Sequence, residues 1–275
     1  MTRPDLPARD DHTLPDHDLP DHDLPDDIPE PASIALSDLS AALTLGWRDF
    51  RRAPAFGLLF SAFYVLGGWA LASVAFASGQ DWWLIPFILG FPLIAPFAAT
   101  GLYEVSRRIE AGEPLDTARI LRVVFEQRQR QIPSMAMVIL LLFMFWVFVA
   151  HTVFALFMGV SALTHITSSA EVLLQGRGLV MLVLGTLIGG GFAAVLFSFT
   201  VVGLPLLLDR EVDFITAIIT SCRAVAANPG VMAAWAALIA IWLFVAILPG
   251  FLGLLIVLPV LGHASWHLYR RVMAD

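Results

Sequence analysis

The 275-residue sequence contains no lysine and only one cysteine, Cys222, and only 14% of its residues are charged. A single cysteine excludes a disulfide framework or a cysteine metal site within one chain. The charged residues cluster between long apolar runs, 58% of all residues are hydrophobic, and the mean hydropathy is +0.79. A soluble domain has roughly 45–50% apolar residues. The composition therefore excludes a soluble protein and indicates a membrane protein.

The chain also lacks the short motifs that mark common enzymes. We find no Walker A loop, dinucleotide fingerprint, HExxH, CxxC or G-x-S-x-G pattern. His165, Ser168 and Glu171 lie close together in one polar loop, but such a combination occurs by chance in many loops. A secretory signal is missing as well, so the first internal apolar run is expected to act as an uncleaved signal. We expect no enzymatic activity, no cofactor, no metal and no nucleic-acid partner.

Six apolar runs are present, and runs of about 20 residues are needed to cross a hydrocarbon core roughly 30 Å thick. They predict an all-α integral membrane protein with six transmembrane helices arranged as three hairpins. The second run contains three prolines, which predict a kink. The runs are about 56–77, 83–106, 133–158, 179–208, 230–248 and 251–269.

Arginine fixes the predicted orientation. With the N-terminus in the cytoplasm, fifteen of the sixteen arginines fall on the cytoplasmic side and only Arg177 falls outside. This asymmetry follows the positive-inside rule. It predicts a multi-pass protein of the bacterial inner membrane with both termini cytoplasmic.

Residues 36–52 predict an amphipathic helix on the cytoplasmic surface, with Ser37 or Asp38 as its N-cap. One helical face collects its large apolar side chains, with Trp47 expected at the headgroup level. These side chains are Leu36, Leu39, Leu43, Trp47 and Phe50.

The same order of surface helix, proline and two-span hairpin recurs at 36–108, 115–210 and 213–271. Pro54, Pro133 and Pro229 begin the first span of each unit. Sixteen residues before these prolines lie Asp38, Thr117 and Asp213, which are all plausible N-caps. We interpret the units as parallel repeats. The alternative is convergence, because every multi-span protein needs polar connectors.

Few ionisable residues lie near the apolar runs, and these are the functional candidates. Glu104 has Arg107 and Arg108 three and four residues later, which fits an interfacial ion pair or, alternatively, a proton or cation site. His263 and His267 share one helical face near the cytoplasmic end. They could ligate a metal or haem, but packing is the simpler interpretation.

Two further features lie away from the cytoplasmic ends of the predicted spans. His151 follows Pro133 by eighteen residues, which is about 27 Å along a helix, so it is expected near the outer face and far from the other two histidines. Gly185 and Gly189 form a G-x-x-x-G pair, which predicts close helix packing.

The first 33 residues form a separate low-complexity tail before the membrane domain of residues 34–272. Three consecutive D-H-x-L-P copies span residues 11–25, and proline at every fifth position excludes helix and sheet. We expect an acidic, disordered arm. His12, His17 and His22 could collect a divalent metal only weakly.

Four stretches carry a family resemblance: 46–50 (GWRDF), 101–114 (GLYEVSRRIEAGEP), 206–214 (LLLDREVDF) and 258–271 (LPVLGHASWHLYRR). They resemble an uncharacterised family of bacterial integral membrane proteins, domain of unknown function 2189, over roughly residues 36–272. The resemblance implies a multi-span inner-membrane protein and assigns no catalytic residues.

Two functions from different classes remain open at this point. The first is a non-enzymatic scaffold or accessory subunit, in contact with the lipid bilayer and with other membrane subunits or a second copy. The second is a transporter of small molecules or lipids, because a proline-rich span and a glycine-rich span can form a substrate path. Redox chemistry with haem or quinone is a more distant alternative.

Overall fold

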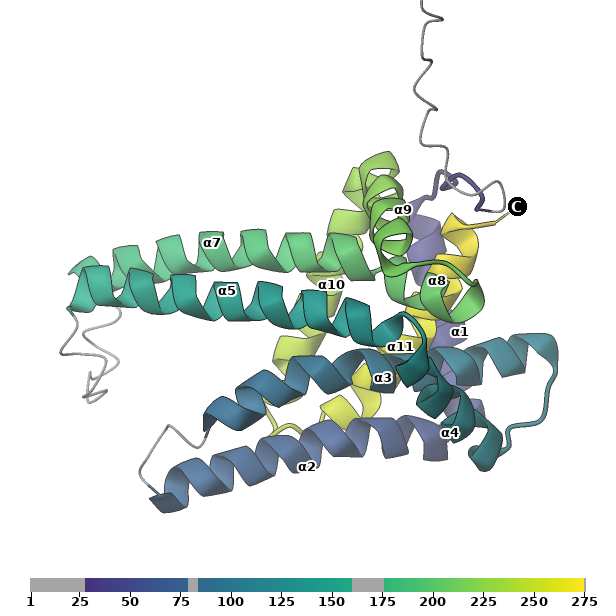
Figure 1. Ribbon diagram of the computed structural model, residues 1–275, viewed down its shortest axis with the longest axis horizontal. Coiled ribbons are helices and arrows are strands. Elements are labelled where there is room, and N and C mark those ends of the chain that lie inside the picture. Colours follow the sequence, from purple (N-terminus) through teal and green to yellow (C-terminus); the bar gives the residue numbers. More distant parts are fainter. Residues whose placement is uncertain (1–27, 79–83, 160–175, 275) are drawn as a thin grey trace, which may run out of the picture.

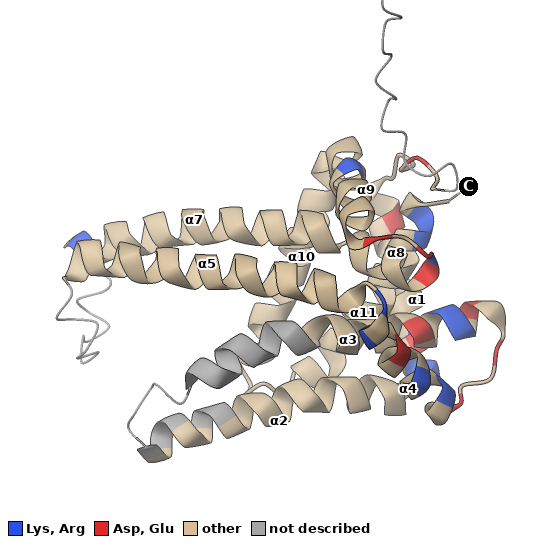
Figure 2. Cartoon of the chain, viewed as in Figure 1, with Lys and Arg blue, Asp and Glu red and all other residues tan. Residues whose placement is uncertain are grey.

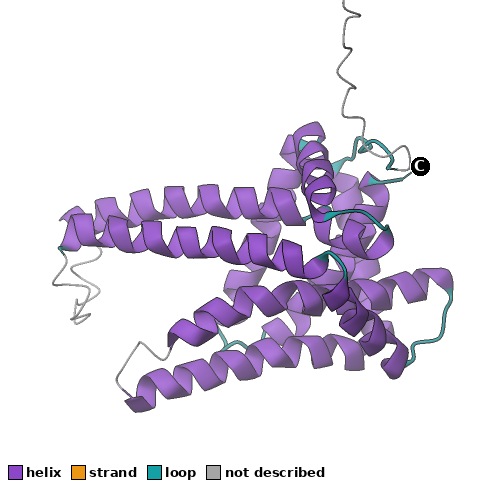
Figure 3. Cartoon of the chain, viewed as in Figure 1, coloured by secondary structure: helices purple, strands orange, loops and turns teal. Residues whose placement is uncertain are grey.

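The computed structural model describes residues 28–78, 84–159 and 176–274, and these residues form helices and loops without any strand (Figure 3). The helices are α1 (Leu36–Arg52), α2 (Pro54–Ser78), α3 (Leu84–Ala111), α4 (Thr117–Glu126), the 3₁₀ turn η2 (Gln127–Gln129), α5 (Ile132–Met158), α7 (Gly176–Thr200), α8 (Gly203–Asp209), α9 (Phe214–Ala227), α10 (Pro229–Ile247) and α11 (Leu254–Val272). Most of the predicted disordered tail and the loop with His165, Ser168 and Glu171 lie outside the described residues.

The three prolines begin long helices, as predicted. α2 starts at Pro54, α10 starts at Pro229, and Pro133 is the second residue of α5. Proline suits this place because the first backbone N–H groups of a helix have no intrahelical acceptor and its φ is already helical.

The predicted N-caps are right at one helix of three. Asp213 caps α9 by accepting from the backbone N–H groups of Ile215 and Thr216. The cap of α4 is Asp116 and not Thr117, and the cap of α1 is Ala35. Asp38 lies in the first turn of α1, where its carboxylate accepts from the N–H of Ala35 at 2.8 Å. The distance from cap to proline therefore differs among the three units.

Two predicted elements are broken into two pieces each. The surface helix expected before Pro133 in the second unit forms α4 and then the 3₁₀ turn η2. The fourth apolar run forms α7 and the short helix α8, separated at Val201 and Val202. By contrast, α3 passes its prolines without an interruption of the helix.

By length and apolar composition, three helical segments of the described residues could cross a membrane: α5, the combined stretch Gly176–Asp209, and α10. A fourth is obtained if α1 and the first part of α2, bent by 98°, count as one span. The all-helical membrane protein is thus confirmed, whereas six spans in three hairpins are not. The last helix, α11, combines its apolar residues with two histidines and two arginines.

The helices gather at one end of the molecule. α5 and α7 lie side by side and extend away from a region where α11 contacts α1 and α8 and where α4 packs against α3 (Figure 1). Figure 2 shows most acidic and basic residues at this same end, which we call the charged end, while Arg177 lies at the opposite tip of α7.

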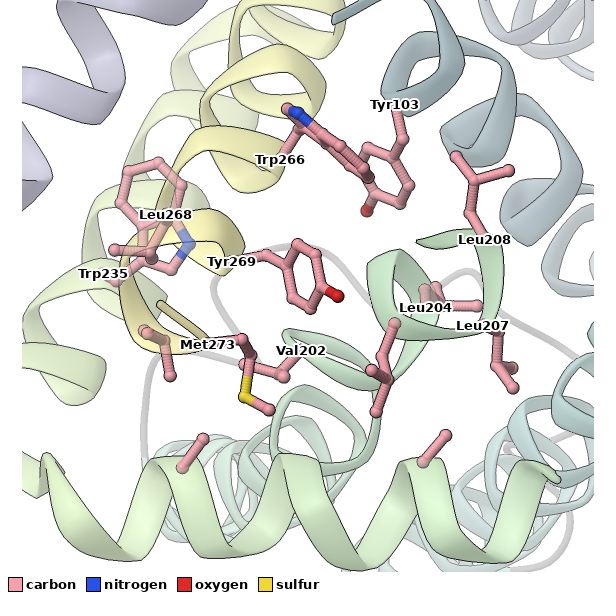
Figure 4. Packing of buried hydrophobic residues seen from close by; sticks show 14 of the residues in the cluster. Tyr103, Val202, Leu204, Leu207, Leu208, Trp235, Trp266, Leu268, Tyr269 and Met273 are labelled. Atoms are coloured by element: carbon pink, nitrogen blue, oxygen red, sulfur yellow. The ribbon is translucent and has the colours of Figure 1, made fainter. Parts of the chain in front are cut away.

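The largest hydrophobic core also lies at the charged end. Side chains from α8 pack against the last turns of α11, with Trp235 of α10 and Tyr103 of α3 beside them (Figure 4). Trp235, Trp266 and Tyr269 are almost completely buried. The core therefore holds the charged ends of several helices in fixed positions.

α1 has the predicted bounds, and it packs against the rest of the protein through a stripe that the apolar pattern did not predict. Leu36 is 64% exposed and Trp47 is 45% exposed. The buried stripe consists of Leu39, Ala42, Gly46, Asp49 and Phe50. The stripe includes small residues because α1 packs directly on the backbone of α11, a contact that the apolar pattern alone did not reveal.

Candidate functional site

Four buried polar side chains from three helices form what we call the polar network: Asp49 of α1, Ser106 of α3, and His263 and His267 of α11. Nε2 of His267 lies 2.6 Å from Oδ2 of Asp49, and Nδ1 of His263 lies 2.8 Å from Oγ of Ser106. Asp49, Ser106 and His263 have no exposed surface, and His267 is 6% exposed. The predicted histidine pair therefore does share one face, but each histidine has a partner on another helix.

Asp49 and Ser106 were missed by the sequence analysis. One signal was available for Asp49: it follows Ala42 and Gly46 at helical spacing, so an acid continues a stripe of small residues. Small residues on one face indicate close helix packing. Nothing comparable singled out Ser106.

One nitrogen of the polar network has no partner. Nδ1 of His263 contacts Oγ of Ser106, and the Ser106 side chain also helps to hold the pKa of the Asp49 carboxyl below its usual value. Nε2 of His263 is buried and has no hydrogen-bond partner among the described residues.

The charge of Asp49 is stabilised from two sides. Burial raises the pKa of this carboxyl, but the hydrogen bond and the charge of His267 outweigh burial and hold the pKa below its usual value. Arg48, whose side chain is 57% exposed, contacts Oδ1 of Asp49 at 3.2 Å. Arg48 thus connects the polar network, which extends inward to His263, with the protein surface.

A close backbone contact positions the network. A Cβ atom on Gly46 would lie 2.6 Å from the backbone nitrogen of Ala264 and 2.7 Å from the carbonyl oxygen of Val260. Gly46 precedes Asp49 by three residues, and Ala264 precedes His267 by three. Only glycine lets α1 approach α11 closely enough for Asp49 to reach His267.

Glu104 forms an ion cluster at the end of α3. Its carboxylate accepts from Nε and Nη2 of Arg107 at 2.7 and 2.9 Å and from Nε of Arg108 at 2.6 Å. The hydrogen bond with Glu104 raises the pKa of the Arg107 guanidinium. Glu104 and Arg108 are both buried, so this ion pair lies inside the protein. Arg108 also lies 3.4 Å from the Glu113 carboxylate in the loop after α3.

A third group of contacts joins the ends of α3, α8 and α11. Glu110 of α3 accepts from Nε1 of Trp266 at 3.0 Å and contacts Arg270 at 3.3 Å. Asp209 of α8 accepts from the Tyr269 hydroxyl at 2.7 Å and lies 3.6 Å from Arg270. The last residues of these three helices therefore meet at the charged end.

The remaining candidates lie along α5 and α7. His151 is exposed on α5 and donates from Nδ1 to the Val147 carbonyl of its own helix at 2.8 Å. A Cβ on Gly189 would lie 2.9 Å from the Trp146 ring, so this glycine does pack closely. A Cβ on Gly185 would meet nothing within 4 Å. Only Gly189 of the G-x-x-x-G pair therefore packs closely against another helix of the same chain.

The geometry limits the chemistry of this site. The acidic side chains of Asp49 and Glu104 are buried and already bound by basic or histidine groups of the same chain. Among the described residues, no group of three or more His, Cys, Asp or Glu side chains could hold a metal ion. The polar network joins helices, and among its own four side chains Nε2 of His263 is buried without a hydrogen-bond partner.

A family model matches residues 84–209 of the chain. No curated protein and no solved structure matches the chain. The match covers α3 to α8, including Glu104, Ser106, Arg107 and Arg108, whereas the stretches at 46–50 and 258–271 lie outside it. Residues 84–209 match the model of the family described as predicted integral membrane protein (DUF2189), so the resemblance to that family is confirmed over this part of the chain.

Proposed function

We propose that this integral membrane protein is a non-enzymatic scaffold or accessory subunit of a membrane complex. It would lie in the bacterial inner membrane with both termini and the charged end in the cytoplasm. The arginine distribution supports this orientation: among the described residues, the charged end holds nearly all arginines and Arg177 lies at the opposite tip (Figure 2).

One observation carries the proposal: an open apolar groove between α5 and α7. The groove has a volume of about 480 Å³, and it is lined by Trp146, Ala150, Val153, Phe154, Met181, Leu182, Gly185, Thr186 and Gly189. Gly185 lies in this groove with open space above its Cα. Small residues at a membrane helix surface let a second backbone come close. The groove is thus suited to a transmembrane helix of a partner subunit.

The rest of the α5–α7 pair also faces away from the chain. Leu141, Phe148 and Leu156 of α5 are 61%, 67% and 78% exposed, and Leu187 of α7 is 69% exposed. Lipid covers such surfaces at no cost, so exposure alone does not require a partner. The open glycine in the groove is the feature that distinguishes a docking site from a lipid-facing surface.

Native mass spectrometry after gentle extraction tests the proposal. We expect a co-purified membrane subunit with the unmodified chain and its loss in Gly185→Leu, which fills the groove. Gly191→Leu is the matched control, because Gly191 lies on the same helix, is also open, and lines no described groove. A bare monomer from both the unmodified chain and the control would refute the proposal.

A transporter of small molecules or lipids is the second candidate. It is favoured by the apolar cavities between α2, α3, α7, α10 and α11. Gly190 lines one of these cavities. If Gly190→Leu and Glu104→Gln leave every measured flux and growth phenotype unchanged, transport is contradicted.

A further inference from the structure

Two adjoining cavities lie beneath the charged end, away from the α5–α7 groove. The smaller, of about 190 Å³, lies between α2, α3, α10 and α11. The larger, of about 610 Å³, opens between α7 and α10. Both are lined by Tyr103, Ile239, Leu243 and Ser265, so one ligand could occupy them together.

The walls of the two cavities contain no charged residue. They consist of alanine, glycine, leucine, isoleucine, valine and aromatic side chains together with a few hydroxyl groups. An uncharged apolar lining excludes an ion or a charged headgroup inside the cavities, because a buried charge needs a partner. The lining therefore selects an apolar chain with a neutral polar group.

A buried hydroxyl identifies the polar group. Ser61 lines the smaller cavity, is 1% exposed, and its hydroxyl has no hydrogen-bond partner among the described residues. A buried hydroxyl without a partner is unfavourable, and Ser61 has one proton to donate. A ligand with a neutral acceptor oxygen, such as an ester carbonyl, would supply the partner.

The lining residues give the ligand a direction. Tyr103 directly precedes Glu104, and Ser265 lies between His263 and His267, so both residues adjoin the charged end. Ser61 lies seven residues beyond Pro54, which is about 10 Å along α2 from its first residue. A carbonyl group at Ser61 therefore leaves the headgroup of the same lipid pointing toward the charged end.

We propose that these cavities bind one acyl chain of an ester-linked diacyl lipid, with its ester carbonyl accepting a hydrogen bond from Ser61. The charged headgroup would remain outside, at the charged end. A helix cannot be the occupant of the smaller cavity, because a helix with its side chains is about 10–12 Å wide. This binding site is independent of the partner groove at Gly185.

The test uses the full-length protein in detergent and native mass spectrometry. It is titrated with dioleoylphosphatidylcholine and with the ether-linked analogue of the same chains and headgroup, which lacks the carbonyls. The unmodified protein is expected to retain one ester lipid per chain and to hold the ether analogue about 2- to 10-fold more weakly, the net effect of one hydrogen bond. In Ser61→Ala the two lipids should bind equally.

Ser198→Ala is the matched control, because Ser198 lies on α7, bonds the Ala194 carbonyl of its own helix, and lines neither cavity. It should preserve the preference for the ester lipid. Ser61→Leu, which fills part of the smaller cavity, should abolish the retained lipid. Equal retention of ester and ether lipids by the unmodified protein, or an unchanged preference in Ser61→Ala, would overturn the proposal. Lipid retention can be measured whether or not a partner subunit is bound. The lipid proposal can therefore be tested even if the scaffold proposal fails.

Discussion

Nε2 of His267 lies 2.6 Å from Oδ2 of Asp49, although 218 residues separate them in the sequence. The contact joins α1, the first helix, to α11, the last. The segment before α1 strengthens the same junction, because the N–H of Ala32 donates to the Val272 carbonyl at 2.7 Å. The N-terminal and C-terminal helices of the membrane domain are thus held together by hydrogen bonds at the charged end.

Asp49→Ala should destabilise the protein by about 2–3 kcal/mol, because it removes a charged acceptor and leaves buried donors without a partner. Thermal unfolding in detergent provides the measurement. Arg48→Ala is the control and should cost less than about 1 kcal/mol, since its side chain is 57% exposed. In Asp49→Ala/His267→Ala the two losses should be less than additive. Full additivity would show that the contact contributes nothing.

Gly46→Ala should separate α1 from α11, because the new Cβ would lie 2.6 Å from the backbone nitrogen of Ala264. Such overpacking costs about 1–3 kcal/mol, so we expect a lower melting temperature and faster proteolysis near α1. Gly191→Ala offers the comparison, since its Cβ meets nothing within 4 Å. This change should be neutral or slightly stabilising. An equal effect at both glycines would argue against the close contact.

Glu104→Gln should destabilise the protein by about 3 kcal/mol, because it removes the nearest carboxylate of the buried Arg108 guanidinium and leaves only the partly exposed Glu113, at 3.4 Å. Glu113→Gln is the milder counterpart, as that side chain is 42% exposed. If Glu104 were instead a proton or cation site, Glu104→Gln would change ion flux in vesicles while the melting temperature stayed the same. Measuring both quantities on one preparation separates the two interpretations.

Asp213 should make stability depend on pH in the acid range. Its hydrogen bonds, chiefly with the Thr216 side chain, hold the pKa of this carboxyl below its usual value of about 4. The stabilisation is therefore present above that value and is lost as the pH falls through the lower pKa of the folded state. Asp213→Ala should cost about 1 kcal/mol at pH 7. The difference from the unmodified protein should shrink in acid, and a difference that persists there would contradict the capping role.

The orientation can be tested by replacing Cys222, introducing single cysteines elsewhere, and treating cells with a membrane-impermeant thiol reagent. With both termini in the cytoplasm, cysteines at positions 80 and 165 should react from outside, and cysteines at 118 and 218 should react only after the membrane is opened. The opposite pattern would reverse the orientation. Reaction at all four positions in sealed cells would contradict the predicted spans.

Helix boundaries could be predicted where the signal is local. The bounds 36–52 of the first helix and the starts at Pro54 and Pro229 match the structure, and α5 begins one residue before Pro133. Proline gives a local signal, because it is favoured in the first turn of a helix. The contact between α1 and α11 could not be predicted in this way. The apolar pattern draws attention to large hydrophobic side chains, whereas the close contact with α11 requires small residues, at Ala42 and Gly46.

The sequence by itself determined that this is a helical membrane protein with its charges concentrated at one end, since hydropathy, arginine asymmetry and proline are properties of short segments. The tertiary structure alone decided which polar groups meet. Asp49 with His267, Ser106 with His263, and Glu110 with Trp266 are each separated by more than 150 residues. Such contacts depend on how helices pack in three dimensions, and no local spacing encodes them. For the same reason the unpaired hydroxyl of Ser61 became visible only within its cavity.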